Sequence, residues 1–448
     1  MHFAPDRPPA VAPSLGTAPA KVERHFRYFD ARLPNAWWSG AFAFGMGACL
    51  LAASAAGQRM GVIGFLALTG IMAALFPHGF VRANARNVIL WISPLWGLFS
   101  VVWSIDPDRT LHISMLTLPT MAAGLAIGGM LHRRAAAAGL ALALTAYIGY
   151  SFLYGASVLF SDTGSGGEAF AGITTGKNFF GHLSAITLMM TPIFLLFARD
   201  RWTVPVVAIT GIFALLSGIG LVKSHATGSI IATLIAFMVL ATVLVFRRVS
   251  LNFRVVLLAA VLGVLTLYFI FGDQLRDEVF SAILTQFNKD VTLTGRVVLW
   301  DYADRLIQTR YWLGFGSGAF WYYTNPEAWT LWRMMGVSPM SGFNFHNTPR
   351  DILIDTGMIG LILYVATYGY TLLRTAWRSL ASGDLLSAVG LGFIMYFVVR
   401  LPVETTGVGA LSIDGLALLL FLSLTARRSE TDVDVRAVIR RQARHFRD

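Results

Sequence analysis

The chain consists of long apolar runs separated by short polar segments. A helix needs about 20 apolar residues to cross a bilayer, and runs of roughly this kind, with few or no charges, lie at 36–56, 60–76, 87–103, 114–130, 136–157, 179–197, 203–222, 228–246, 255–271, 356–373, 385–401 and 408–425. This pattern predicts an all-α polytopic membrane protein with about 12 transmembrane helices.

The same pattern divides the chain into five parts. We expect a disordered, proline-rich tail at 1–35, transmembrane helices 1 to 9 at 36–271, one long polar segment at 272–350, transmembrane helices 10 to 12 at 351–425, and a basic tail at 426–448. Both tails are expected in the cytoplasm, for the reason given below.

Composition supports the membrane assignment and excludes other classes. Of 448 residues, 56% are hydrophobic and 13% are charged, whereas an ordinary soluble domain carries about 25% charged residues. A soluble enzyme, a disordered chain and a nucleic-acid-binding module are therefore excluded. The single cysteine, Cys49, rules out an intrachain disulfide and a cysteine-based metal cluster.

Basic residues predict the orientation of the chain. One set of alternating short loops carries eleven arginines, and the two tails add five and seven basic residues to the same side; the opposite short loops carry only Arg59, Arg109, Lys177, Lys223 and Arg400. Because basic residues concentrate on the cytoplasmic side, both termini are expected there and the 272–350 segment, hereafter called the external segment, on the opposite face. The net charge of +11 is thus mainly a topology signal and not a sign of a nucleic-acid partner.

The 272–350 segment is the expected catalytic domain, because long loops are uncommon unless they carry function or are disordered, and this one is rich in aromatic residues. Apolar residues four apart predict amphipathic helices at 273–287 and 297–309, the second ending before Gly314, Gly316 and Gly318. Such helices either lie on the outer leaflet or pack onto the transmembrane bundle.

A helix start is predicted at the end of this segment. Asn347 or Thr348 can cap a helix whose first position is Pro349. His346 then lies just before the amino end, a place suited to phosphate or pyrophosphate, where a neutral imidazole can take a proton from a hydroxyl. On this local chemistry alone, a structural role for His346 is the more common case.

Several segments resemble the bacterial O-antigen ligase/polymerase superfamily. These are LTGRVVLW (293–300), GFGSGAFW (314–321) and HNTPRDILIDTGMIG (346–360), while GKNFFGHLSA (176–185) resembles an outer-face motif of the succinoglycan-type exopolysaccharide polymerases. The layout of helices around one large external loop is similar too. The chain departs from the family at SHATGS (224–229), where Ala226 and Thr227 replace an expected basic residue; Lys223 or His225 would have to supply that charge.

The resemblance implies a glycosyltransferase of the bacterial inner membrane that needs no metal or cofactor and uses a glycan on undecaprenyl pyrophosphate as its donor. It implies His346 as general base and Arg296 as the contact to the pyrophosphate. The further substrate-binding candidates are Lys177, Asn178, Arg305, Arg310, Asn347 and Arg350. Each basic candidate has an alternative role as a solvated or lipid-headgroup contact. The partners implied are a lipid-linked oligosaccharide donor and acceptor and the lipid bilayer, and exposed loops leave room for a chain-length regulator.

Two activities fit this resemblance. A polymerase joins lipid-linked repeat units, whereas a ligase moves a finished glycan onto lipid A-core or a protein. The 176–185 motif and the Gly-rich 314–321 segment favour the polymerase, which we expect, although the His346 pattern favours the ligase. A transporter or flippase is the alternative of another class; His182 and Asp414 are the main ionisable groups in the spans, fewer than ion-coupled carriers use.

Overall fold

A computed structural model describes residues 35–54, 58–160, 167–174, 176–198, 204–246, 248–250, 253, 296–340, 342–381, 385–407 and 409–426. All of them belong to one unit, Pro34–Asp448. The expected tails at 1–34 and 427–448, the run at 255–271 and the helix at 273–287 lie outside these residues.

Each predicted apolar run within the described residues is helical. The helices are α2 (Ala36–Ala53), α3 (Gln58–Leu75), α6 (Pro107–Met130), α7 (Arg133–Tyr154), α8 (Lys177–Ala198), α9 (Val204–Lys223), α10 (Thr227–Phe246), α14 (Thr348–Ala381), α15 (Leu385–Arg400) and α16 (Ile413–Ala426). The run at 87–103 is divided into η1 (Val88–Trp91), α5 (Ile92–Phe99) and η2 (Ser100–Val102), where η marks a 3₁₀ helix.

The predicted number of membrane crossings is not confirmed. Five described helices are long and apolar enough to span a bilayer: α2, α6, α7, α10 and α14. A sixth span is possible if α3 and α4 (Pro77–Arg86), bent by 104° at Phe76, count as one. The other apolar helices are shorter. Length and composition within the described residues thus support a polytopic membrane protein, with fewer full-length spans than the expected 12.

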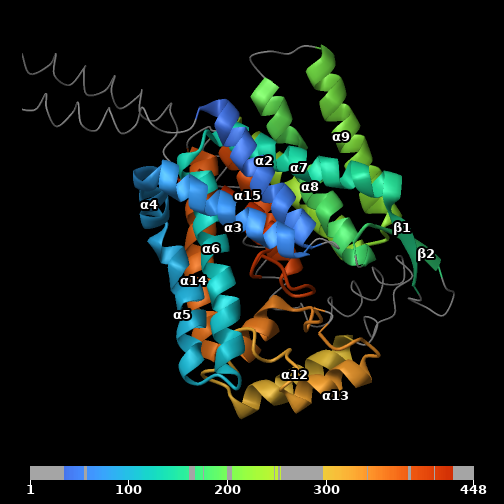
Figure 1. Ribbon diagram of the computed structural model, residues 1–448. Coiled ribbons are helices and arrows are strands. Elements are labelled where there is room, and N and C mark those ends of the chain that lie inside the picture. Colours follow the sequence, from blue (N-terminus) through green and yellow to red (C-terminus); the bar gives the residue numbers. More distant parts are fainter. Residues whose placement is uncertain are drawn as a thin grey trace, which may run out of the picture. The chain divides into compact units, whose positions relative to one another are not determined.

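Figure 1 shows how these helices gather. α2 packs against α3 and α7, α6 against α16, α8 against α9, and α10 against α15. α14 lies beside α5 and α15, and its first turns contact α12 (Arg296–Thr309) of the external segment. The external segment is therefore packed onto the end of the helical bundle, which was one of the two arrangements expected for its helices.

A short β-hairpin interrupts the all-α pattern. β1 (Ala156–Phe160) pairs antiparallel with β2 (Gly167–Gly172), with Val158 opposite Ala169. Its phenylalanine, Phe170, stacks on Phe152 of α7 and meets the edge of Phe180 of α8. β-branched and aromatic residues favour extended backbone in this stretch, so the hairpin covers the ends of two helices where no regular structure was predicted.

The external segment has a hydrophobic core of its own. The predicted helix at 297–309 is confirmed as α12, and a second helix, α13 (Pro326–Met334), follows. Buried side chains from both helices and from the connecting loops meet in this core: Leu299, Leu306, Phe320, Leu331 and Phe345. Ile354 of α14 belongs to the same cluster, so burial of apolar surface fixes the segment to the start of α14.

A kink in α14 receives the external segment. Gly357 has φ 67° and ψ −170°, a backbone conformation found essentially only in glycine, which costs other residues about 1–3 kcal/mol. A Cβ atom there would lie 2.3 Å from the carbonyl oxygen of Trp312. Beyond the kink, Met358 N–H donates to Tyr311 O at 2.8 Å and Ile359 N–H to Trp312 O at 3.3 Å. The backbone of the external segment therefore satisfies the hydrogen bonds that the kink leaves open.

Candidate functional site

His346 lies immediately before α14, as the sequence predicts. Asn347 caps the helix, because its Oδ1 accepts a hydrogen bond from Arg350 N–H at 3.0 Å. However, the N–H groups of Thr348 and Asp351 donate to Leu401 O and Asn347 O. These donors of the first turn are engaged within the protein, so they are not open to a phosphate in this structure, and phosphate binding at this helix start stays an expectation.

The His346 ring is hydrogen-bonded to the carboxylate of Glu404, a residue that the sequence did not single out. Its Nδ1 lies 3.0 Å from Glu404 Oε2, and Arg296 donates to Glu404 Oε1 at 2.8 Å and to Val403 O at 2.6 Å. Burial alone would raise the pKa of Glu404, but the His346 hydrogen bond and the Arg296 charge hold that pKa well below the usual carboxyl range.

The charge of Glu404 determines which nitrogen of His346 can act as a base. An ionised carboxylate only accepts hydrogen bonds, so the Nδ1 of His346 carries the hydrogen. In the neutral ring Nε2 is then the acceptor. The arrangement gives a histidine whose ring is held by a carboxylate and whose second nitrogen can take a proton, as in other carboxylate-oriented bases.

Glu404 is held in place by the start of α14. It lies in the connection between α15 and α16, and Thr348 Oγ1 donates to its backbone carbonyl at 2.8 Å. Asn347 Nδ2 donates to Pro402 O at 2.8 Å. Sequence reasoning missed Glu404 because a single acidic residue in a short loop has no motif spacing; its one signal is a position four residues after Arg400, which ends α15.

A buried polar cluster joins α8, α15 and α16. Arg400, 4% exposed, donates to Tyr396 Oη at 2.9 Å and to His182. His182 Nδ1 also lies 2.8 Å from Tyr396 Oη, and its Nε2 lies 3.7 Å from Asp414. His182 is therefore a buried, hydrogen-bonded residue, and the charge of Arg400 contributes to the lowered pKa of Glu404.

The expected residues Lys177 and Asn178 lie at the amino end of α8, both partly buried. This end of the helix is one turn from His182. Gly181 brings α8 close to the turn between α9 and α10, because a Cβ at Gly181 would lie 2.4 Å from Ser224 Oγ. Lys223 and His225 on that turn are exposed, so the departure from the family pattern lies directly beside the 176–185 motif.

The other expected arginines have partners in the external segment or next to it. Arg350 forms a two-bonded ion pair with Asp304, both bonds at 2.8 Å. Arg305 lies over the ring of Tyr302, and Arg310 donates to Trp103 O at 3.2 Å. These contacts favour structural roles for the three arginines. Only Arg296 of the arginines expected from the sequence contacts the carboxylate that holds His346.

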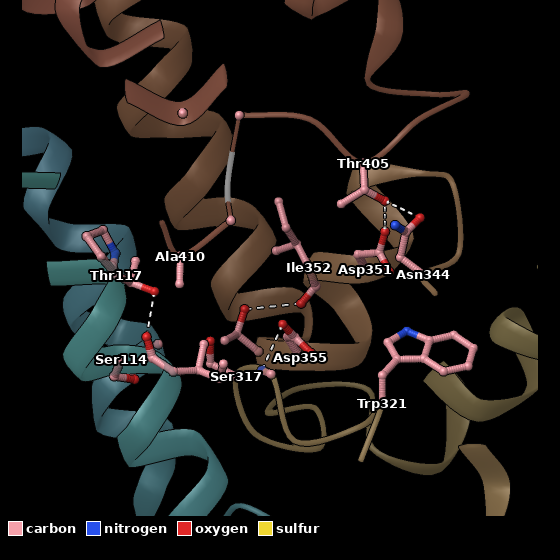
Figure 2. Close-up of a pocket in the computed structure, with 18 of the residues that line it drawn as sticks. Ser114, Thr117, Ser317, Trp321, Asn344, Asp351, Ile352, Asp355, Thr405 and Ala410 are labelled. Carbon is pink, nitrogen blue, oxygen red and sulfur yellow. Dashed lines mark hydrogen bonds between the residues drawn. The ribbon is translucent and has the colours of Figure 1, made fainter. Parts of the chain in front are cut away.

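A cavity of about 370 Å³ lies beside the group formed by His346, Glu404 and Arg296 (Figure 2). Its walls come from α5, α6, α14, the external segment and the connection before α16. Asn344 and Thr405 line the cavity. Both also adjoin His346 and Glu404, because the backbone N–H of His346 donates to Asn344 Oδ1 at 2.8 Å and Thr405 directly follows Glu404 in the sequence. Thr405 Oγ1 in turn donates to Asn344 Oδ1 at 3.0 Å. The cavity and the His346 group thus share one wall.

Apolar helices and a folded external segment define a polytopic membrane protein. A family model described as O-antigen ligase matches residues 212–365, which include Arg296 and His346. The chain is also 25% identical over 337 residues to the exopolysaccharide production protein ExoQ of Rhizobium meliloti (strain 1021), a match covering 72% of this chain and 73% of that protein. Together they support the resemblance to the O-antigen ligase/polymerase superfamily, near the ExoQ branch. These matches support a polymerase-type or ligase-type role in polysaccharide synthesis.

Proposed function

We propose that the chain is a polysaccharide polymerase of the bacterial inner membrane. It transfers a glycan from undecaprenyl pyrophosphate to a hydroxyl of another lipid-linked repeat unit, on the periplasmic face and without a metal ion. The observation that carries this proposal is the His346–Glu404–Arg296 group, which supplies an oriented base beside a cavity. The similarity to an exopolysaccharide production protein supports the choice of polymerase.

The proposed reaction is a displacement at the anomeric carbon of the donor. Nε2 of His346 takes the proton of the acceptor hydroxyl, and the acceptor oxygen forms the new bond to the anomeric carbon. The bond from that carbon to the pyrophosphate oxygen breaks, and its electron pair leaves with undecaprenyl pyrophosphate. A positioned base contributes about 10²–10⁴-fold to such a step, and Glu404 stabilises the imidazolium that forms.

The leaving pyrophosphate needs positive charge and hydrogen-bond donors. Each terminal nitrogen of Arg296 carries two N–H groups, and each uses one on the 403–404 segment. Arg296 therefore holds Glu404 and retains donors for a pyrophosphate oxygen. Lys177 and Asn178, at the amino end of α8, are the remaining substrate-binding candidates that this proposal uses. Arg305, Arg310 and Arg350 serve mainly to fold the external segment.

A ligase is the second candidate function. The family model that covers Arg296 and His346 is described as O-antigen ligase, and the same base and leaving group serve both reactions. The two enzymes differ in the acceptor, which is a lipid-linked repeat unit for the polymerase and lipid A-core or a protein for the ligase. The acceptor is therefore what the experiment must identify.

The test is His346→Ala in the native host, with lipid-linked intermediates and surface polysaccharide both resolved by size. For a polymerase, the polymer ladder disappears and single repeat units accumulate on the lipid. For a ligase, long chains accumulate on undecaprenyl pyrophosphate and do not reach their final acceptor. His112→Ala, at an exposed position of α6, is the matched control and leaves both pools unchanged. Normal glycans in His346→Ala, at normal protein levels, would refute the base assignment.

A further inference from the structure

The cavity beside His346 contains buried polar groups that have no partner. Among the described residues, Ser114 Oγ, Trp321 Nε1, Trp332 Nε1 and Arg109 Nε accept or donate no hydrogen bond, and all four residues line the cavity. Ser114 is 3% exposed and Trp332 is 1% exposed. Proteins pair nearly all of their buried polar groups, so four unpaired groups around one cavity indicate a ligand that offers several hydrogen-bonding groups, as a sugar does.

Two carboxyl groups of α14 face the same space. Figure 2 shows Asp355 between Ser114 of α6 and Trp321, and Asp351 beside Thr405 and Asn344. The Asp355 carboxyl accepts a single hydrogen bond from the described residues, from Gly318 N–H at 3.1 Å. Its remaining acceptor sites are available to hydroxyl groups, which are the donors that a sugar offers.

The charges of the lining disfavour a pyrophosphate in this cavity. Arg109 is the one basic side chain among the described lining residues, and its guanidinium lies over the ring of Tyr322, 4.8 Å from its centroid. It faces two carboxyl groups, Asp351 and Asp355. An anion with two phosphates would meet a single cation here, whereas a neutral glycan would meet acceptors, N–H donors and hydroxyls.

Trp321 gives the cavity an aromatic wall. Its ring packs against Phe345 at 4.8 Å and Phe343 at 5.2 Å between centroids, so its orientation is fixed by the core of the external segment. The sequence alone does not distinguish a sugar-stacking tryptophan from one in an interfacial belt. The structure places Trp321 and Trp332 in the wall of the cavity, with their indole N–H groups unpartnered among the described residues.

We infer that this cavity binds the acceptor sugar, a neutral and polyhydroxylated glycan terminus, while the pyrophosphate of the donor lies on the Arg296 side of Glu404. This inference rests on the proposed function, because it assigns one substrate of that reaction to a place. The shared wall of Asn344 and Thr405 puts the acceptor next to His346. As part of this inference, the hydroxyl to be deprotonated approaches His346 from the cavity side.

The test uses the full chain in lipid nanodiscs. Lipid-linked repeat units extracted from the source bacterium are the donor. The acceptor is the same oligosaccharide released from its lipid by mild acid and labelled at its reducing end, so it carries neither lipid nor pyrophosphate. The variants are Ser114→Ala, Trp321→Phe and Asp355→Asn. Ser217→Ala, a buried α9 serine without a described hydrogen bond and outside the cavity lining, is the matched control.

We expect each cavity variant to raise the half-saturating concentration of the labelled acceptor, by roughly 3- to 10-fold for Ser114→Ala. Inhibition by undecaprenyl pyrophosphate without a glycan should stay at the wild-type level, and Ser217→Ala should match the wild type throughout. An unchanged acceptor constant in all three variants would overturn the inference. The inference would also be overturned if the variants weakened inhibition by undecaprenyl pyrophosphate but left the half-saturating concentration of the acceptor unchanged.

Saturation-transfer NMR with the unlabelled oligosaccharide separates this inference from the proposed function. If the wild type transfers nothing but binds the oligosaccharide, and Ser114→Ala weakens that binding, the cavity is a glycan site and the polymerase proposal fails. If the wild type shows transfer to lipid-linked units but the oligosaccharide neither binds nor accepts, the assignment of the cavity fails and the polymerase proposal stands.

Discussion

At the scale of single residues, Glu404 is what gives His346 a defined chemical state. The carboxylate fixes the imidazole ring and the position of its hydrogen, and Arg296 fixes the carboxylate. A histidine in a loop without such a partner would rotate and would present either nitrogen. Arg296, Glu404 and His346 are therefore linked in a row by hydrogen bonds, and replacing Glu404 should change the positions of both other side chains.

Glu404→Gln should lower transfer by on the order of 10²-fold or more, because the amide retains the shape of the side chain but not the charge that stabilises the imidazolium. The rate of glycan transfer by the purified chain measures this. Glu404→Asp should recover part of the activity. Glu327→Gln, which removes a carboxylate bonded to Tyr302 in the same segment, is the control; an equal loss there would mean that general damage to the segment explains the effect.

The lowered pKa of Glu404 also makes a prediction about stability and pH. Its pKa in the folded chain lies below the ordinary carboxyl value, so its contribution to the free energy of unfolding is complete above the ordinary value and is lost as the pH falls through the folded-state value. The difference in melting temperature between wild type and Glu404→Gln should stay constant from about pH 8 to about pH 5 and shrink below that. A difference that grows on acidification would contradict the pKa assignment.

Local sequence patterns predicted part of the candidate site. The capping signal of Asn347 and Pro349 placed His346 correctly at a helix start, and the structure confirms that cap. Glu404 and Arg400 could not be predicted, because their role depends on how the end of α15 packs against the start of α14. For the same reason, the sequence could not show that the N–H groups at this helix start already have acceptors in the protein. One of these acceptors, Leu401 O, is distant in the sequence.

At the scale of elements, the kink in α14 is the joint between the bundle and the external segment. Apolar runs predicted the described helices because hydrophobicity alone defines a span. The kink was not predicted, since Gly357 lies inside an otherwise continuous helical pattern. The β-hairpin was missed for a similar reason: two strands of five and six residues carry too little pattern to stand out between long helices.

Gly357→Ala should destabilise the chain by about 1–3 kcal/mol from its positive φ and by more from the contact with Trp312. Gly369→Ala is the matched control, because Gly369 lies in the same helix and a Cβ there meets nothing within 4 Å. The control should be neutral or slightly stabilising, since alanine favours the helix by up to about 1 kcal/mol. Thermal unfolding in detergent compares the two, and equal melting temperatures would argue against the kink as a structural joint.

At the scale of the whole molecule, the described contacts separate two ends of α14. Its first turns hold the external segment, whereas Arg374 near its other end donates to Asn87 at 3.4 Å and Arg378 donates to Thr425 O at 2.9 Å. The arginines expected in the cytoplasm are thus at the end away from His346. The grouping of the other basic residues and the direction of the chain across the membrane stay predictions.

Cysteine labelling tests that direction. In a Cys49→Ala background, which removes the single native thiol, Thr330→Cys on α13 should react with a membrane-impermeant maleimide in cells with a permeabilised outer membrane. Ala85→Cys on α4 should react only after lysis. Both positions are exposed, so accessibility within the protein does not separate them. The reverse labelling pattern would show that α13 lies on the cytoplasmic side and α4 on the opposite side, contrary to the proposed topology.

The separation of 58 positions between His346 and Glu404 also has a consequence for biogenesis. α14 and α15 lie between the base and the carboxylate that orients it. A ribosome that has released α14 has therefore made a histidine without its partner, and the pair forms only after α15 and the following connection have been inserted and folded back. If this site performs the proposed glycan transfer, that activity begins only when synthesis of nearly the whole chain is complete.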